Sequence, residues 1–91
     1  MDNNKLRENL EELYLELLQM SPDEKSLLEK RDTLAARIQD SLAKEDLGGF
    51  KSSLSSLKEL IEESLISFEV EHPKVTQMIS RIENLLSSIG I

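Results

Sequence analysis

Apolar residues recur along the chain at alternating steps of three and four, the spacing that places side chains on one face of an α-helix. The first row predicts a helix from about Asn4 to Met20, in which Tyr14 and Leu18 widen the apolar face. The next row predicts a helix that runs to about Lys44. The first row is Leu6, Leu10, Leu13, Leu17 and Met20; the second is Leu28, Arg31, Ala35, Ile38 and Leu42, with Leu27 and Leu34 beside it.

Two more rows predict helices in the second half of the chain. The third helix starts near Phe50 and is broken by His72-Pro73, because the residue before a proline is pushed out of helical geometry. The fourth starts at Pro73 and ends at a Schellman motif, with Gly90 left-handed. The third row is Phe50, Leu54, Leu57, Ile61, Leu65 and Phe68; the fourth is Val75, Met78, Ile82, Leu85 and Ile89.

One short segment separates the two helices of the first half, and another separates the first half of the chain from the second. Ser21, Pro22 and Glu24 match a capping box, which predicts that the second helix starts with Ser21 as N-cap and Pro22 as its first residue. Gly48-Gly49 predicts a flexible break, since paired glycines tolerate the left-handed conformation that ends helices.

The predicted fold is therefore all-α, with four helices in a bundle-like arrangement within one domain, residues 1–91. Residues 1–47 and 50–91 form two proline-cornered helical hairpins joined at Gly48-Gly49. Short connections favour antiparallel neighbours. The apolar content is modest, so a homodimer that completes the bundle is an alternative to a monomer.

The two halves overlay when the chain is shifted by about 51 residues, and Pro22 then falls on Pro73. In this overlay Leu15 and its counterpart Ile66 point away from the main apolar rows, and Val70 lies one turn beyond Ile66. Single exposed aliphatics are ordinary at a protein surface. The alternative is that Leu15, Ile66 and Val70 bind a second subunit or another protein.

The formal charge is −7 and the pI is about 4.7. Such a balance argues against nucleic-acid and anionic membrane partners, which need a basic surface. The chain has no cysteine, so it has no disulfide or thiol chemistry. No apolar signal segment or membrane-length apolar run is present, and we expect a cytoplasmic protein.

Glu69 and His72 are the one candidate pair for metal chemistry. Their i, i+3 spacing is the Glu-x-x-His spacing of carboxylate-bridged metal sites in helix bundles. The chain has a single histidine, so a complete site requires a homodimer that doubles the pair. The structural alternative is a histidine at the helix corner, where the end of a helix dipole favours a positive charge.

No catalytic pattern is evident. A lone histidine before proline gives no Ser-His-acid arrangement, and Gly48-Gly49 lacks the Lys-Ser/Thr of a phosphate-binding loop. The adjacent pairs Glu11-Glu12 and Glu62-Glu63 are typical of solvated helix faces. We expect no enzyme activity and no cofactor.

Residues 68–91 resemble the C-terminal part of a known protein family. Phe68-Glu69-Val70-Glu71-His72-Pro73, one helix and a Gly-Ile ending resemble a family of short bacterial helical proteins that has only a domain-of-unknown-function label. The resemblance implies a bacterial, helical protein and no mechanism. The sequence thus predicts a small non-catalytic interaction or assembly protein; the alternative is a metal-binding homodimer using Glu69 and His72.

Overall fold

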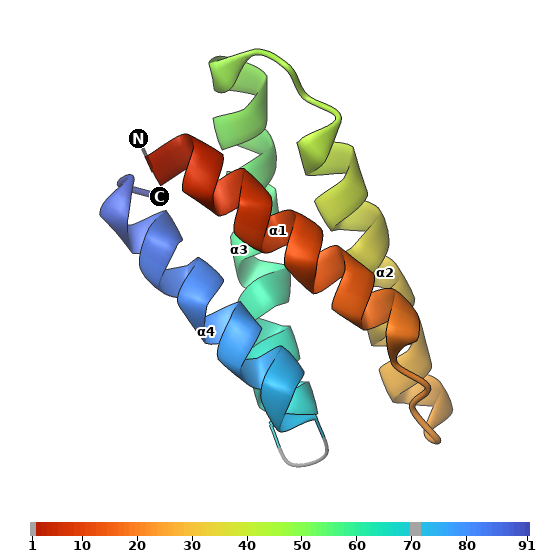
Figure 1. Cartoon of the computed structure of the whole chain (residues 1–91). Coiled ribbons are helices and arrows are strands. Elements are labelled where there is room, and N and C mark those ends of the chain that lie inside the picture. The colour runs from red at the N-terminus through yellow and green to blue at the C-terminus, as the bar shows by residue number, and fades with distance from the viewer. Residues whose placement is uncertain (1, 70–71) are drawn as a thin grey trace.

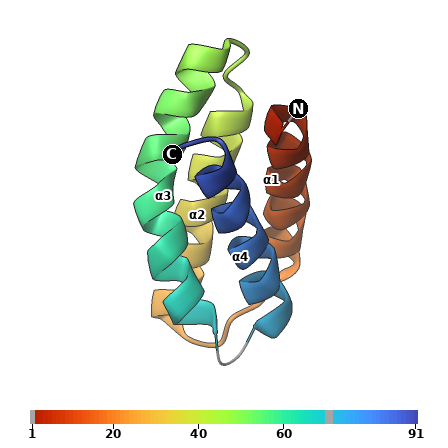
Figure 2. The same cartoon turned by 90° about the vertical axis from the view of Figure 1, so that its left-hand side faces the viewer.

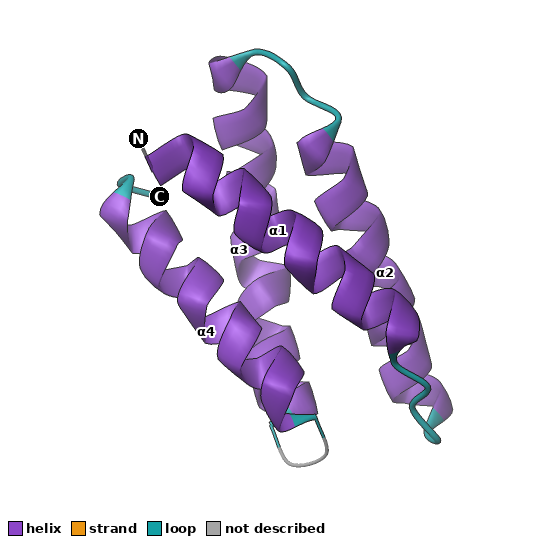
Figure 3. Ribbon diagram, viewed as in Figure 1, coloured by secondary structure: helices purple, strands orange, loops and turns teal. Residues whose placement is uncertain are grey.

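The computed structural model describes residues 2–69 and 72–91. Its four α-helices are α1 (Asp2–Gln19), α2 (Lys25–Leu42), α3 (Leu47–Phe68) and α4 (Pro73–Ser88) (Figure 1). All the described regular structure is helical (Figure 3). The all-α, four-helix prediction is confirmed.

The helices form a closed ring in which each packs on two neighbours. α1 packs on α2 and α4, and α3 also packs on α2 and α4. Among the described residues the backbones of α1 and α3 do not approach each other, although the Arg7 side chain of α1 reaches the Phe50 ring of α3. The views in Figures 1 and 2 agree that α1 and α3 occupy opposite corners. The single chain therefore encloses a core, in a bundle 37 Å long with cross-section extents of 21 and 19 Å.

The core is built from the inward face of every helix, and it contains both phenylalanines. α1 and α3 contribute the predicted rows almost unchanged, except that Leu65 is only half-buried. The buried apolar residues are Leu6, Leu10, Leu13, Leu17, Met20, Leu27, Leu34, Ala35, Ile38, Phe50, Leu54, Leu57, Ile61, Phe68, Val75, Ile79, Ile82 and Leu86.

On α2 and α4 the buried face is rotated about the helix axis from the predicted row of apolar residues. On α4 the buried residues include Ile79 and Leu86, whereas Met78 and Leu85 are half-buried at the edge of the core. On α2 the buried face is centred on Leu27, Leu34, Ile38 and Ser41. The reason is that each helix packs between two neighbours, which makes its apolar face wider than one row.

Leu18 was predicted to widen the apolar face of the first helix, and this is wrong. Its side chain is 53% exposed, whereas Tyr14 is half-buried against the core. Leu18 lies one turn beyond Leu15 on the outer side of α1, so it adds to the exposed apolar surface of that helix.

The predicted capping box at the first corner is also wrong. α2 begins at Lys25, its N-cap is Glu24, and the Glu24 side chain makes no capping hydrogen bond. Residues 20–24 reverse the chain direction instead. Arg31 of α2 fixes this corner by donating a 2.7 Å hydrogen bond from Nη1 to the Met20 carbonyl oxygen, so its head group is not simply solvated as a surface arginine would be.

Gly48 and Gly49 are not a flexible, left-handed break, because both lie in the first turn of α3 with negative φ. Asp46 is the N-cap and accepts a 2.7 Å hydrogen bond from the Gly49 N–H. A Cβ on Gly49 would lie 2.9 Å from Asp46 Oδ1. The glycine therefore makes room for the capping carboxylate.

The last corner and the C-terminal cap agree with the sequence. His72 is the N-cap of α4 and Pro73 its first residue. Gly90 has a φ of 84°. The Ile91 N–H donates to the Leu86 carbonyl oxygen and the Gly90 N–H to that of Ser87, which is the Schellman pattern.

Cations from neighbouring helices hold three of the helix C-terminal ends. Arg31 binds the end of α1, as described above. Arg7 of α1 donates to the carbonyl oxygens of Leu42 and Lys44, at 3.3 and 2.7 Å, at the C-terminal end of α2. Lys58 of α3 donates to the Ile91 carbonyl oxygen at 3.1 Å, beside α4. Leu42 is the last residue of α2, and the other three carbonyl groups lie one to three residues beyond a helix. The cations are thus placed near the negative ends of the helix dipoles.

Arg7→Met should destabilise the fold by about 1–2 kcal/mol, because it removes two charge-assisted hydrogen bonds and a cation–π contact. The Arg7 guanidinium carbon lies 3.9 Å from the centroid of the Phe50 ring. Urea unfolding followed by circular dichroism measures the change. Arg37→Met on the exposed side of α2 is the control, and equal stability of the two variants would contradict the capping role.

Candidate functional site

The Glu69–His72 region does not form a metal-binding arrangement in the described residues. Glu69 is exposed at the C-cap of α3. The His72 ring packs edge-on against Phe68, with centroids 5.8 Å apart and an interplanar angle of 77°. Its Nε2 is buried without a hydrogen-bond partner among the described groups. Glu71 and Val70 lie outside the described residues.

A metal ion needs several oxygen or nitrogen ligands that converge on one point. No group of three or more His, Asp or Glu residues in positions 2–69 and 72–91 is arranged to hold an ion. The metal-binding alternative therefore gains no support from the structure, and the His72 ring serves as a packing group at the α3–α4 corner.

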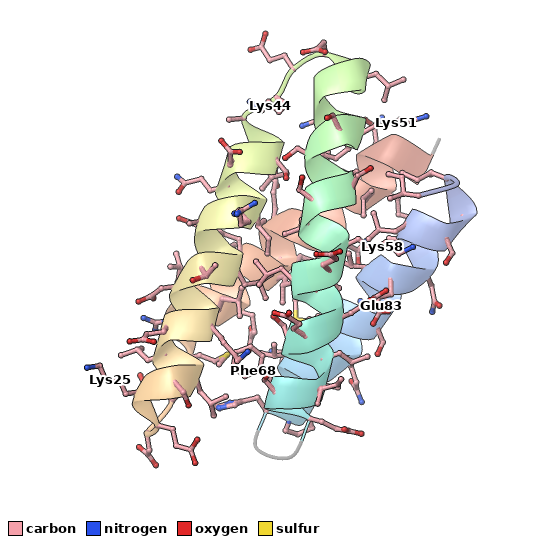
Figure 4. All side chains as sticks on the ribbon, turned by 180° about the vertical axis from the view of Figure 1, so that it is seen from behind. Lys25, Lys44, Lys51, Lys58, Phe68 and Glu83 are labelled. Atoms are coloured by element: carbon pink, nitrogen blue, oxygen red, sulfur yellow. The ribbon has the colours of Figure 1, made fainter. Side chains whose placement is uncertain are left out.

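A polar groove of about 390 Å³ lies on the surface between α2 and α3. Figure 4 looks onto this seam, with both helices in front. Its walls carry both charges, including Arg37, Lys44 and Asp40, and several serine hydroxyls. The buried Ser41 hydroxyl and the Ser53 hydroxyl share a 2.6 Å hydrogen bond across the same seam. The groove contains no histidine, and its polar groups suggest no reaction.

Leu15 and Ile66 are both exposed, as their positions in the sequence predict. Leu15 on α1 is 58% exposed, and Ile66 on α3 is 75% exposed. The structure does not bring them together, because α1 and α3 stand at opposite corners and both side chains point away from the core. α1 is in front in Figure 1 and α3 is in front in the reverse view of Figure 4. They belong to two separate surfaces.

Each of these aliphatic residues follows three exposed glutamates at the same spacing. On α1 they form the α1 face, defined as Glu8, Glu11, Glu12 and Leu15. On α3 they form the α3 face, defined as Glu59, Glu62, Glu63 and Ile66. The two faces share one pattern, Glu-x-x-Glu-Glu-x-x-aliphatic, with the intervening core residues turned inward.

The carboxylates of the two faces are not neutralised within the chain. The ion pairs between described residues are Arg31–Asp32 and Lys74–Glu16, at 2.7 and 3.4 Å, and neither involves an α1-face or α3-face glutamate. The cations nearest in sequence, Arg7 and Lys58, point to helix C-terminal carbonyl groups instead. Each face is thus an anionic surface with a large aliphatic side chain at one end.

The matching glutamates of the two faces are visible in the 51-residue overlay of the sequence. It places Glu8 on Glu59 and the pair Glu11-Glu12 on Glu62-Glu63, but glutamate pairs on helices are common. What the pattern could not reveal is that the two faces point in opposite directions. That follows from the order of helices around the ring.

Comparison with known proteins places the chain in a family. Residues 6–91 match the family described as a domain of unknown function (DUF4404). The chain belongs to this family. No curated protein and no solved structure matches it. The match agrees with the expected domain-of-unknown-function label, whereas the bacterial origin and the Phe68–Pro73 block as a family signature stay predictions. None of the described DUF4404 helices is long and apolar enough to cross a membrane.

We expect the protein to contain no stoichiometric metal when it is purified without chelator or affinity tag, since the described residues provide no converging ligands. Elemental analysis measures the content, and thermal unfolding with and without EDTA measures any coupling to stability. Glu69→Gln is the matched variant. A metal that is bound by the unmodified protein and lost from this variant would contradict this expectation and support a metal site at Glu69 and His72.

Proposed function

We propose that this DUF4404 protein is a small non-catalytic helical interaction protein that binds partners through the α1 face and the α3 face. One observation carries the proposal. The chain buries its apolar rows in a closed bundle, yet it leaves an aliphatic residue exposed at the same place on two helices. Aliphatic side chains on outer helix faces are typical anchors for helix–helix recognition.

The non-catalytic part of the proposal rests on the surroundings of the reactive groups. The His72 ring packs on Phe68 and makes no hydrogen bond to a described carboxylate or hydroxyl. The polar groove between α2 and α3 carries opposite charges and hydroxyl groups without a histidine. General acid–base and nucleophilic catalysis both require a hydrogen-bonded pair of such groups.

The partner is either a second copy of the chain or another protein. A homodimer would bury Leu15 against Leu15, or Ile66 against Ile66, through a two-fold axis. Either pairing brings six glutamates of like charge together at one interface. Their mutual repulsion costs free energy, and salt screens this repulsion. The charge of the faces therefore favours another protein over self-association.

Site-specific photo-crosslinking in cells of the encoding organism tests the proposal. A photoreactive phenylalanine analogue at position 15 or 66 should give discrete cross-linked products, because these side chains would lie at the interface. The same analogue at the exposed position 39 of α2, outside both faces, is the control.

The product masses separate the outcomes. A product of twice the chain mass from position 15 or 66 means a homodimer, and another discrete mass means a different protein. Equal labelling at positions 15, 39 and 66, or no product at all, would contradict an interaction role for these faces.

A further inference from the structure

We propose that the α1 face and the α3 face are two matched docking sites for a cationic amphipathic helix, so that one chain binds two such segments. This inference rests on the proposed interaction function and names the chemical class of the partner. The occupant is a helical segment of another protein that carries one row of aliphatic residues flanked by lysine or arginine.

Charge complementarity selects this occupant. Every ionisable group in the two faces is a carboxylate, six in all, and none has an ion-pair partner among the described residues. An approaching cation therefore does not have to displace an existing partner. Complementary charges raise association rates and suppress wrong partners.

The exposed aliphatic residues make a helix a better occupant than a flexible basic tail. Leu15 lies seven residues after Glu8, and Ile66 lies seven residues after Glu59. Seven helical residues rise about 10 Å, so the first glutamate and the aliphatic residue are two turns apart on the same side of the helix. A partner helix can match this distance with a cation and an aliphatic residue two turns apart. A disordered tail would have to become ordered at an additional entropic cost.

A second copy of the chain is a poorer occupant. The cations of its α2 helix lie among three exposed carboxylates, and its α4 helix exposes Lys74 and Arg81. Lys74 already pairs with Glu16 of α1 at 3.4 Å. The outer side of α4 carries no large exposed aliphatic residue that would meet Leu15 or Ile66. It lacks both the charge density and the apolar anchor that the two faces require.

The closed ring makes the two sites independent. α1 and α3 stand at opposite corners of the ring, and their outer sides face away from each other. A partner helix on one face cannot contact a partner on the other. The chain can thus join two copies of the same cationic segment, with a stoichiometry of two.

Isothermal titration calorimetry with a synthetic peptide tests the inference. The probe is a helical peptide with leucines every three or four residues and lysines on both sides of that row. The control peptide, or glutamate twin, has the same sequence with glutamates in place of the lysines. We expect two lysine peptides to bind per chain, with an affinity that falls as salt increases, and the glutamate twin not to bind.

Single substitutions assign each binding event to one face. Leu15→Ser should weaken one of the two sites about tenfold, and Ile66→Ser the other, because each removes the apolar burial and leaves the charge unchanged. Leu47→Ser is the matched control, since Leu47 is 50% exposed on α3 but lies outside both faces. Circular dichroism confirms that the variants keep their helical content.

The outcomes distinguish this inference from the function on which it rests. Binding that is insensitive to Leu15→Ser and Ile66→Ser, or equally sensitive to Leu47→Ser, would be non-specific attraction to an acidic protein and would overturn the inference. A stoichiometry of one would overturn the matched pair. Cross-links at positions 15 and 66 without peptide binding would leave the interaction function in place and exclude the cationic helix.

Discussion

The burial of one apolar face per helix between two neighbours is the constraint on which the structure depends. Ninety-one residues supply a single core, and the ring α1–α2–α3–α4 closes it within one chain. Because connections between consecutive helices are short, the ring also fixes which helices stand at opposite corners. The outer sides of α1 and α3 must then face away from each other. The protein's most distinctive surface features, Leu15 and Ile66, lie on these two sides.

The two halves of the chain use equivalent residues to hold equivalent helix ends. Arg7 and Lys58 coincide in the 51-residue overlay, and each donates to carbonyl groups just beyond the second helix of its own half. The core residues Leu6 and Leu57 coincide as well. This correspondence extends from the core through the helix ends to the outer glutamates. A duplicated binding surface is what a duplicated hairpin would provide.

Helical spacing was sufficient to predict the four helices, the His72–Pro73 corner and the Gly90 cap, because these depend on local backbone preferences. The details that failed depend on neighbours. The overlay aligns Pro22 with Pro73, yet only Pro73 starts a helix, since α2 begins at Lys25. The predicted flexible break at Gly49 is wrong because this glycine makes space for the Asp46 carboxylate, and no local backbone preference reveals that contact. The exposure of Leu15 and Ile66 could be predicted, but their separation could not, because it depends on the order of helices around the ring.

Pulsed electron resonance on spin labels at positions 15 and 66 tests whether the two faces point in opposite directions. The chain has no cysteine, so two introduced cysteines would be the sole labelling sites. We expect one distance, longer than the 19 Å narrowest extent of the bundle, and no dipolar signal from either singly labelled protein. A shorter distance would place both residues on one surface and contradict the two opposed faces. A signal from a singly labelled protein would show that copies of the chain pair through that face.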